Sequence, residues 1–376
     1  MLLFAFMLCF SCKEKKTTPQ ENKKQGNTEI RYAQGFDIEK KAEGVTVVSV
    51  NSPWPGANKK FVYALVQREL LPGLTLNTDE YDAIISVPVE RVIATSTTHI
   101  PSLEVLGVAK SLVGFPDTRY ISSPLTRKRI DEGQLMDIGR NESLNTEMTI
   151  ALNPDIIFGF SVNGENRTYE TVKQAGIPAV YNGDWTENSP LGKAEWIKFY
   201  GPFFGKEEEA AREFAKIESA YLEARALAKS AEDRPTVLSG ALYKDVWYLP
   251  AGESWAASFL EDAGANYLWK DSPGTGSLSL SIETVFTQGQ EASFWVSPSQ
   301  YTTYSELKEG SRHYEQFRAY RERKVYTFAG TKGPTGGLLY YEMAPGKPHE
   351  VLKDLIAIFH PELLPNRELL FFKPLK

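Results

Sequence analysis

Two glutamates hold matching positions in two near-copies of one pattern, and this spacing is the clearest sign of a chemical role in the sequence. The first copy covers residues 145–158 and contains Glu147, and the second covers residues 281–296 and contains Glu283. Each copy reads as a short helix opened by the glutamate, a polar turn and a β-rich apolar run typical of a buried strand. Two such units on either side of one long charged helix predict two α/β lobes joined by a strut, an architecture that closes on a ligand.

The residues that usually carry catalysis do not form a recognisable site. There is no Gly-x-Ser-x-Gly elbow, and no paired carboxylates stand out among the acidic residues. The glycine-rich segment 330–337 lacks the Gly-Lys-Ser/Thr ending of a phosphate-binding loop. We expect a surface loop there, or alternatively part of a cleft rim. An enzyme and a structural surface lipoprotein are the less favoured alternatives to a binding protein.

The histidines do not predict a metal site. His99, His313, His349 and His360 show no ligand spacing among themselves, whereas proteins that bind bare transition-metal ions cluster histidines and carboxylates. His99 lies in an expected cleft loop and is a candidate ligand contact. We therefore expect neither a resident metal nor a cofactor, and we expect any bound iron to arrive as a chelate.

Composition places the chain among globular proteins. Of 376 residues, 42% are hydrophobic and 24% are charged, and the net charge is −6. Because nucleic-acid binding needs a basic surface, this balance argues against nucleic acid as a partner.

The N-terminal residues predict a membrane anchor and a tether. Residues 1–11 are almost wholly apolar and precede Cys12, which resembles a bacterial lipoprotein signal in which the cysteine is lipidated. The polar residues that follow lack the apolar content needed to offset ordering entropy. We expect a signal peptide over 1–11, a flexible tether over 12–30 and a location in the cell envelope, facing the periplasm or the exterior. The alternative is a buried N-terminal strand or helix.

The rest of the chain predicts α/β lobes at 31–190 and 235–376, with linker helices at 191–234. Strands are expected at 45–50, 61–67, 111–115, 178–181 and 236–243, and a helix at 191–200 broken by Gly201-Pro202. The long helix is expected at 206–231, with three glutamates in its first turn and an apolar stripe at helical spacing.

In their order and spacing these segments resemble the substrate-binding proteins of bacterial ATP-driven importers for iron–siderophore complexes and cobalamin. The matching segments are 91–96, 147–158, 175–178 and the long helix, and the closing stretch 354–362 is similar to lipoprotein members. The resemblance implies two Rossmann-like lobes joined by one long rigid helix. It also implies a monomer, a membrane anchor, and an ABC permease with its ATPase as partners.

In that family one glutamate on each lobe docks onto arginines of the permease. By motif position the resemblance carries this role to Glu147 and Glu283. The alternative is that each glutamate is simply a favourable charge at a helix N-terminus.

Ligands of open α/β sheets bind outside the carboxyl ends of the strands, which nominates the loops that would face a cleft between the lobes. Aromatic faces and arginines there would suit a large chelate with anionic oxygens. We expect a ferric siderophore, with cobalamin or haem as the alternatives. The expected ligand contacts are Ser96, His99, Arg119, Arg140, Phe160, Trp185, Tyr243, Trp247, Trp255 and Tyr301.

Overall fold

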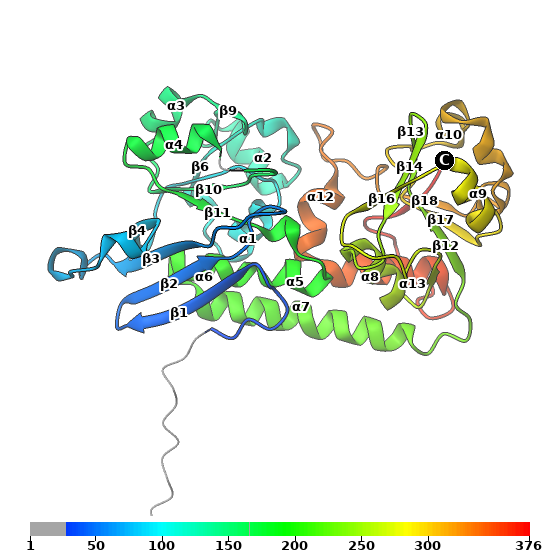
Figure 1. The fold of residues 1–376 in the computed structure, drawn as a ribbon, viewed down its shortest axis with the longest axis horizontal. Coiled ribbons are helices and arrows are strands. Elements are labelled where there is room, and N and C mark those ends of the chain that lie inside the picture. Colours follow the sequence, from blue (N-terminus) through cyan, green and yellow to red (C-terminus); the bar gives the residue numbers. More distant parts are fainter. Residues whose placement is uncertain (1–27, 165) are drawn as a thin grey trace, which may run out of the picture.

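The protein forms two α/β bodies that lie side by side, with one long helix beneath them (Figure 1). The structure, a computed structural model, describes residues 28–164 and 166–376. Each body has its own cluster of buried apolar side chains. The predicted signal peptide and Cys12 lie outside the described residues. Within the described ranges, no helix combines the length and apolarity that crossing a membrane would require.

A five-stranded parallel sheet forms the centre of the first body. Its middle strands are short apolar runs buried on both faces, as expected for parallel strands covered by helices. Because every strand points the same way, the loops at the carboxyl ends gather along one edge. In sheet order the strands are β11 (Ala179–Tyr181), β10 (Ile156–Gly159), β5 (Val92–Ala94), β6 (Leu112–Phe115) and β7 (Met136–Asp137).

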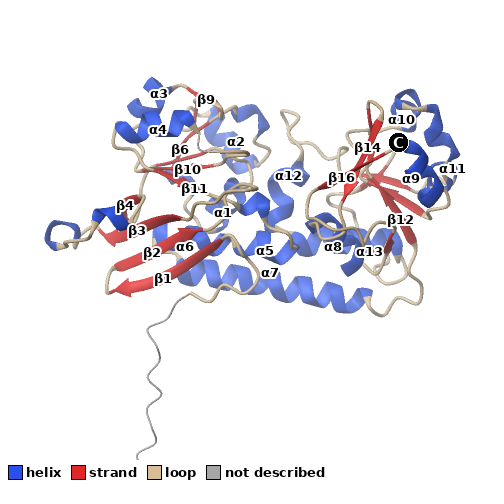
Figure 2. Ribbon diagram, viewed as in Figure 1, coloured by secondary structure: helices blue, strands red, loops and turns tan. Residues whose placement is uncertain are grey.

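A second, four-stranded sheet precedes this unit in the chain and packs beside it (Figure 2). Its first three strands are antiparallel, and the last pairs in parallel with the third. The ring of Phe36 from this sheet packs in a tilted arrangement against Trp196, with ring centroids 4.7 Å apart, which connects the sheet to the linker helices. We call residues 28–90 the N-terminal extension. Its strands are β1 (Phe36–Ala42), β2 (Val45–Val50), β3 (Phe61–Gln67) and β4 (Ala83–Val87).

The second body also holds a five-stranded sheet, in which only the last strand is antiparallel. A three-stranded antiparallel sheet stands next to it. The strands of the larger sheet are β15 (Asn266–Tyr267), β12 (Thr236–Ser239), β17 (Phe294–Val296), β18 (Val325–Thr327) and β19 (Lys373–Pro374). Those of the smaller sheet are β13 (Ala241–Tyr243), β14 (Val246–Pro250) and β16 (Ser277–Leu280).

Helices cover the sheets and connect the two bodies. In the first body they are α1 (His99–Val105), α2 (Pro124–Asp131), α3 (Thr146–Ala151) and α4 (Arg167–Gln174). The connecting helices are α5 (Pro190–Glu195), α6 (Ile197–Phe204) and α7 (Glu207–Ala228). The second body carries α8 (Trp255–Asp262), α9 (Ile282–Gly289), α10 (Tyr304–Gly310), α11 (Arg318–Arg321), α12 (Leu339–Met343) and α13 (Pro348–Phe359).

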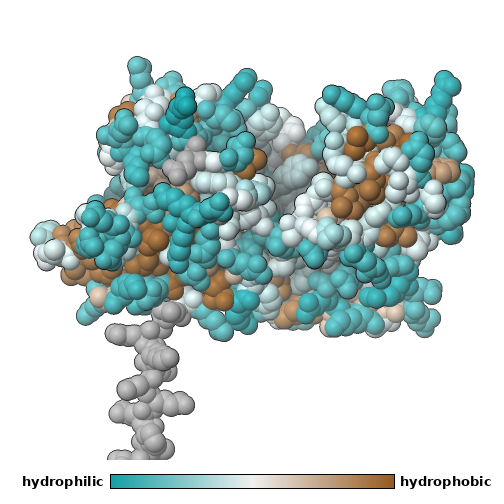
Figure 3. Space-filling view, viewed as in Figure 1, coloured by the Kyte–Doolittle hydropathy of each residue, from teal (hydrophilic) through white to brown (hydrophobic). Residues whose placement is uncertain are grey.

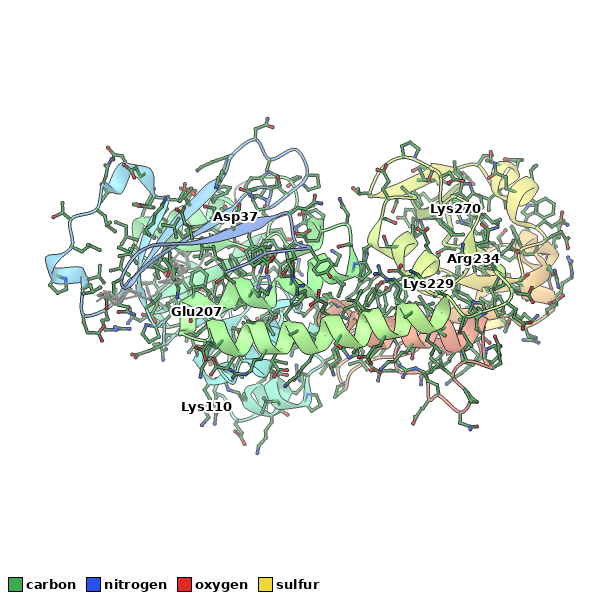
Figure 4. All side chains as sticks on the ribbon, turned by 90° about the horizontal axis from the view of Figure 1, so that it is seen from below. Asp37, Lys110, Glu207, Lys229, Arg234 and Lys270 are labelled. Atoms are coloured by element: carbon green, nitrogen blue, oxygen red, sulfur yellow. The ribbon has the colours of Figure 1, made fainter. Side chains whose placement is uncertain are left out.

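The long helix α7 packs against both bodies. Its first half contributes Ala210 and Phe214 to the first apolar cluster, and its second half contributes Tyr221, Ala224 and Ala228 to the other. Figure 4 shows the helix from below, running from the labelled Glu207 under the first body to Lys229 under the second. The apolar stripe predicted from the sequence is therefore the surface that contacts both bodies.

Two sequence expectations fail locally. The expected strand over 236–243 is divided at Gly240, whose φ of 77° turns the backbone and separates β12 from β13. The expected break at Gly201-Pro202 does not occur: α6 continues through both residues, with Pro202 inside the helix. That helix ends instead at Gly205, which adopts a left-handed conformation.

Candidate functional site

The first body presents a cavity of about 580 Å³ beyond the carboxyl ends of β5, β6 and β10. This is the edge that the strand rule selects for ligands. We call it the arginine cavity, because two arginines stand at its wall. Its lining residues are Thr95, Ser96, Thr97, Phe115, Pro116, Asp117, Arg119, Tyr120, Arg140, Asn141, Glu142 and Phe160.

The two arginines differ in their pairing. Both oxygens of Asp117 engage the guanidinium of Arg119, at 2.7 and 2.9 Å, and this pairing raises the pKa of the arginine. Arg140 is exposed and forms no ion pair with any described residue. Its guanidinium is thus available to anionic oxygens of a ligand, for which charge-assisted bidentate pairing is well suited.

Arg140 lies on a hairpin that is fixed to the body from behind. The hairpin consists of β8 (Gly139–Arg140) and β9 (Ser143–Leu144). At its tip, the Asn141 side-chain oxygen accepts a 2.7 Å hydrogen bond from the Tyr169 hydroxyl, and its amide donates to the Phe160 carbonyl at 3.3 Å. The backbone that carries Arg140 is therefore held in place while the side chain faces solvent.

The second body presents a smaller cavity of about 330 Å³ with an aromatic wall. We call it the aromatic cavity. Tyr243 and Tyr341 are the most open of its rings, with exposed fractions of 66% and 50%. Its polar partners are serines, and its lining contains no charged residue. It is lined by Ser239, Gly240, Ala241, Tyr243, Tyr248, Leu249, Pro250, Trp255, Ala256, Phe259, Leu260, Ser277, Val296, Ser297, Ser299, Phe328, Tyr340, Tyr341, Leu355 and Phe372.

A third cavity, of about 610 Å³, lies between the two bodies. We call it the tryptophan cavity, because Trp54, Trp185 and Trp255 all line it. It adjoins the aromatic cavity through Trp255, which lines both. It approaches the arginine cavity where the rings of Phe160 and Trp185 meet edge to face at 5.8 Å. Figure 3 shows the hollow between the bodies.

Seven of the ten predicted ligand contacts line these three cavities. In the first body the structure brings Ser96, Arg119, Arg140 and Phe160 into one cavity. Trp185, Trp255 and Tyr243 line the other two. Tyr301 lies outside all three, and its ring packs at 6.1 Å against Tyr314.

Trp247 and His99 are corrected by the structure. Trp247 is not on an open loop but on β14, fully buried, 5.5 Å from the ring of Trp295. Its neighbour Tyr248 lines the aromatic cavity instead, because successive side chains of a strand point to opposite faces. His99 is fully buried in α1, so its side chain does not reach the cleft. The same burial lowers the pKa of His99 to about 4.

Three aromatic residues that line the cavities escaped the sequence reasoning: Tyr248 and Tyr341 of the aromatic cavity and Trp54 of the tryptophan cavity. Tyr248 could have been found from strand alternation, since it follows a residue that the core requires. Trp54 sits in the Pro- and Gly-rich loop after β2, and although such a loop favours exposure, the ring is largely buried in the first apolar cluster. Tyr341 lies in the short helix α12, and no local signal distinguishes it from a core tyrosine.

Glu147 and Glu283 occupy the second position of their helices, as their matching motifs predict. Asn145 caps α3 by accepting from the backbone of Met148, and Ser281 caps α9 by accepting from Thr284. Both glutamates are exposed. Neither lines any of the three cavities.

The glycine-rich segment 330–337 reaches from the second body to the first. Its Thr335 hydroxyl donates to the Arg119 carbonyl at 2.6 Å. A β-carbon on Gly337 would lie 2.3 Å from the Tyr120 carbonyl oxygen, so only glycine permits this approach. We call residues 330–343 the latch. Of the two expectations for segment 330–337, the structure therefore supports part of a cleft rim and not a free surface loop.

Glu342 completes the latch. Its buried carboxylate accepts backbone hydrogen bonds from Ser122 and Ser123 at 2.6 and 2.8 Å, at the N-terminus of α2. Burial is the largest influence on this carboxyl and raises its pKa, although the two backbone donors oppose the shift. The carboxylate therefore joins the two bodies beside the arginine cavity.

Among the residues that the structure describes, no group of three or more histidines, cysteines or acids could hold a metal ion.

The sequence model of the periplasmic binding protein family matches residues 92–330. An uncharacterised lipoprotein of Methanocaldococcus jannaschii is 30% identical over 299 residues, which cover 77% of this chain and 69% of the relative. A vitamin B12-binding protein of Vibrio parahaemolyticus is 24% identical over 127 residues, covering 34% of this chain and 44% of the relative.

Solved structures share the fold at low sequence identity. A periplasmic binding protein from Veillonella parvula has a TM-score of 0.60 at 17% identity, covering 91% of this chain and all of the other. A periplasmic haem-binding protein from Pseudomonas aeruginosa has a TM-score of 0.57 at 20% identity, and the match covers 77% of this chain and 98% of the other. A protein of the Fe³⁺-hydroxamate transport system from Saccharomonospora viridis has a TM-score of 0.54 at 18% identity, and the match covers 73% of this chain and 94% of the other.

Proposed function

Because this chain belongs to the periplasmic binding protein family, we propose that it captures an iron–siderophore complex between its two lobes and delivers it to an ABC permease. The family is one of substrate-binding proteins, not enzymes, and its members work with ABC permeases. Family membership thus establishes a solute-binding role in import and confirms the prediction that the chain is not an enzyme. The identity of the solute is the part that we propose.

The observation that carries the proposal is Arg140, which has no ion pair with any described residue and lines the same cavity as Arg119 at the ligand edge of the first lobe. A ferric siderophore offers anionic oxygens around the metal, and a guanidinium binds these in a bidentate manner. The facing lobe offers aromatic rings to its apolar surface. A bare ferric ion would need clustered carboxylates or histidines, which the lining residues of these cavities do not provide.

Haem or cobalamin is the second candidate. The aromatic cavity favours it, because Tyr243, Tyr341 and Trp255 present ring faces and no charge to a flat macrocycle. Proteins that share the fold include binders of haem and of vitamin B12. We rank cobalamin second because it offers less anionic surface to Arg140, and we place haem beside it because its anionic propionates lie at only one edge of the macrocycle.

The long helix α7 is proposed to act as a rigid connection that limits the movement of the lobes. It packs into both apolar clusters, so that bending it would open both cores. We place the lobes at residues 31–190 and 235–376 and the linker helices at 191–234.

Delivery is proposed to use Glu147 and Glu283 as docking points for arginines of the permease. They are exposed, stand at the same step of two equivalent helices and lie outside the cavities. We further propose that the protein is a monomer held at the membrane by a lipid on Cys12, at the periplasmic or outer face of the cell envelope. The similar lipoprotein of M. jannaschii supports the anchor.

Equilibrium titration separates the candidates. Quenching of tryptophan fluorescence should report saturable binding of a ferric siderophore, since Trp54, Trp185 and Trp255 line the cleft. Haem and cobalamin should bind more weakly to the same protein. Tight cobalamin or haem binding with no response to any ferric siderophore would move the function to the second candidate.

A further inference from the structure

The N-terminal extension supplies one wall of the tryptophan cavity, although it precedes the residues that match the family. The contributing residues are Ser52, Trp54, Pro55 and Gly56 in the loop between β2 and β3, and Gln34 and Gly35 before β1. The opposite wall comes from the second lobe, at Ser254–Ala256 and Thr275–Ser277. The cavity is thus built by the extension and by both lobes.

The loop of the extension is fixed in position by several contacts. The ring of Trp54 packs edge to face at 5.7 Å from Phe61 and 5.2 Å from Tyr181. The Pro53 carbonyl accepts a 3.2 Å hydrogen bond from the indole of Trp185. A β-carbon on Gly183 would lie 2.9 Å from the Cα of Pro53, so glycine is needed for this close approach. The extension therefore orients Trp185 as well as adding its own wall.

The charges near this cavity are already engaged by the protein. Among the described lining residues only Glu187 is charged, and its Oε1 accepts from the backbones of Gln34 and Gly35 and from the indole of Trp196. Lys193, which packs on the cavity residue Trp255, is also buried. Its ammonium donates to the Asp184 and Trp185 carbonyls and lies 5.0 Å from the Trp255 ring. The described lining residues therefore present no unpaired charge to the tryptophan cavity, whereas Arg140 lines the arginine cavity.

We infer that the tryptophan cavity is a separate subsite for an uncharged aromatic group of the ligand, and that the N-terminal extension defines it. This inference rests on the proposed function, because it assumes that the cleft also takes a chelate. A flat neutral ring can pack against the partly exposed indoles of Trp185 and Trp255, and it leaves no buried charge without a partner. The adjoining arginine cavity takes the anionic part of the same ligand.

The subsite can be tested without any chelate. We would titrate 2-naphthamide into the protein by calorimetry and tryptophan fluorescence. Gly276→Trp should abolish binding by filling the cavity, since Gly276 lines it and, beyond its chain neighbours, no heavy atom of the described residues lies within 4 Å of the new β-carbon. Gly73→Trp is the matched control, because that glycine is equally unobstructed but lies outside the three cavities.

A second pair of variants tests the contribution of the extension. Pro55→Glu would place a carboxylate on the extension wall and should weaken 2-naphthamide binding by about tenfold, since burying that charge against a neutral ring is costly. Pro72→Glu makes the same change at another exposed proline of the extension, outside the cavity. Equal effects of the two substitutions, or no binding of 2-naphthamide to the unaltered protein, would overturn the subsite.

A pair of chelates connects the subsite to the proposed function. A ferric trihydroxamate carrying a naphthyl group should bind about two- to tenfold more tightly than the same chelate without it. Gly276→Trp should remove that ratio, whereas Gly73→Trp should keep it. An absent ratio in the unaltered protein overturns the subsite. Retained 2-naphthamide binding with no binding of either chelate overturns the iron-chelate function and leaves the subsite standing.

Discussion

The arginine cavity and the aromatic cavity face one cleft but are built from opposite chemistry. The first is formed by loops beyond the carboxyl ends of parallel strands and carries Arg119 and Arg140. The second is formed largely by the antiparallel β13–β14–β16 sheet and by α12, and it carries tyrosines, tryptophan and serines. The two cavities together would suit the proposed ligand, a chelate with an anionic part and an apolar part, and would fix its orientation between the lobes.

The comparison also separates binding from delivery. Neither of the exposed glutamates, Glu147 and Glu283, lines either cavity. Changes to the glutamates should therefore affect uptake alone, while changes within a cavity should affect the ligand that the cavity prefers.

The largest effect is expected from the double substitution Glu147→Arg and Glu283→Arg. It should abolish uptake of the iron chelate in cells while the affinity for that chelate stays nearly unchanged, because reversed charges would repel arginines of the permease. Uptake of radioactive iron and fluorescence titration measure the two properties. As a control, Glu208→Arg changes an exposed glutamate of α7, and normal uptake in the double variant would exclude the docking role.

Trp247→Ala should mainly destabilise the fold. The side chain is fully buried and its indole donates to the Ser239 carbonyl at 3.0 Å. We expect a loss of about 3–5 kcal/mol in the free energy of unfolding, as for other buried large-to-small changes. Chemical denaturation measures it. A stable variant with selectively lost ligand affinity would restore Trp247 as a ligand contact.

Arg140→Ala tests the charged half of the cleft. The guanidinium should contribute about 1.5–3 kcal/mol to binding of an anionic chelate, so the affinity should fall about tenfold or more. Calorimetry with a ferric siderophore and with cobalamin checks this, and cobalamin should respond less. An exposed arginine outside the cleft, Arg167, offers the control change Arg167→Ala. Equal losses for both ligands would contradict the assignment of the cavity.

Tyr243→Ala tests the aromatic half and should have a smaller effect on a siderophore. Stacking on one ring contributes about 0.5–1.5 kcal/mol beyond burial, which corresponds to a two- to tenfold loss of affinity. Haem or cobalamin should lose more than the siderophore does. If Tyr243→Ala weakens the siderophore more than Arg140→Ala does, the division between the two cavities is wrong.

The smallest effect is expected at the latch, which joins the two lobes beside the arginine cavity. Burial raises the pKa of Glu342, so the folded state binds its proton more readily than the unfolded state does. The stability of the protein relative to Glu342→Gln should therefore increase as pH falls from the raised pKa towards the ordinary glutamate value of about 4.3. Thermal or urea unfolding across pH 4–7 measures this difference, and a difference that shrinks on acidification would contradict it.

Much of the fold and part of the site follow from local pattern. The expected strands at 45–50 and 61–67 and the long helix agree closely with β2, β3 and α7. The paired glutamates could be located because each motif combines a cap, a helix and a strand within a few residues. Arg119 and Arg140 were predicted from the rule that ligands bind beyond strand ends, which depends only on the order of strands and loops.

Other features depend on contacts between distant parts of the chain. Either Trp247 or Tyr248 could face the cavity, depending on which side of their strand packs on the core. The contact of Trp247 with Trp295 places Trp247 in the core and leaves Tyr248 to line the cavity. The extension reaches the cleft because its sheet packs against the linker helices and its loop packs against Tyr181 and Trp185.

Local sequence determined the helices, the strands and the exposed glutamates, because hydrophobic periodicity and capping act between residues that are close along the chain. Tertiary structure alone decided which rings line the cleft and which charges are already paired. Glu342 shows why: the backbone donors that satisfy its carboxylate come from Ser122 and Ser123, 220 and 219 positions earlier in the sequence. A buried carboxylate needs such partners, but their position is set by the packing of the two lobes against each other, which no local pattern records.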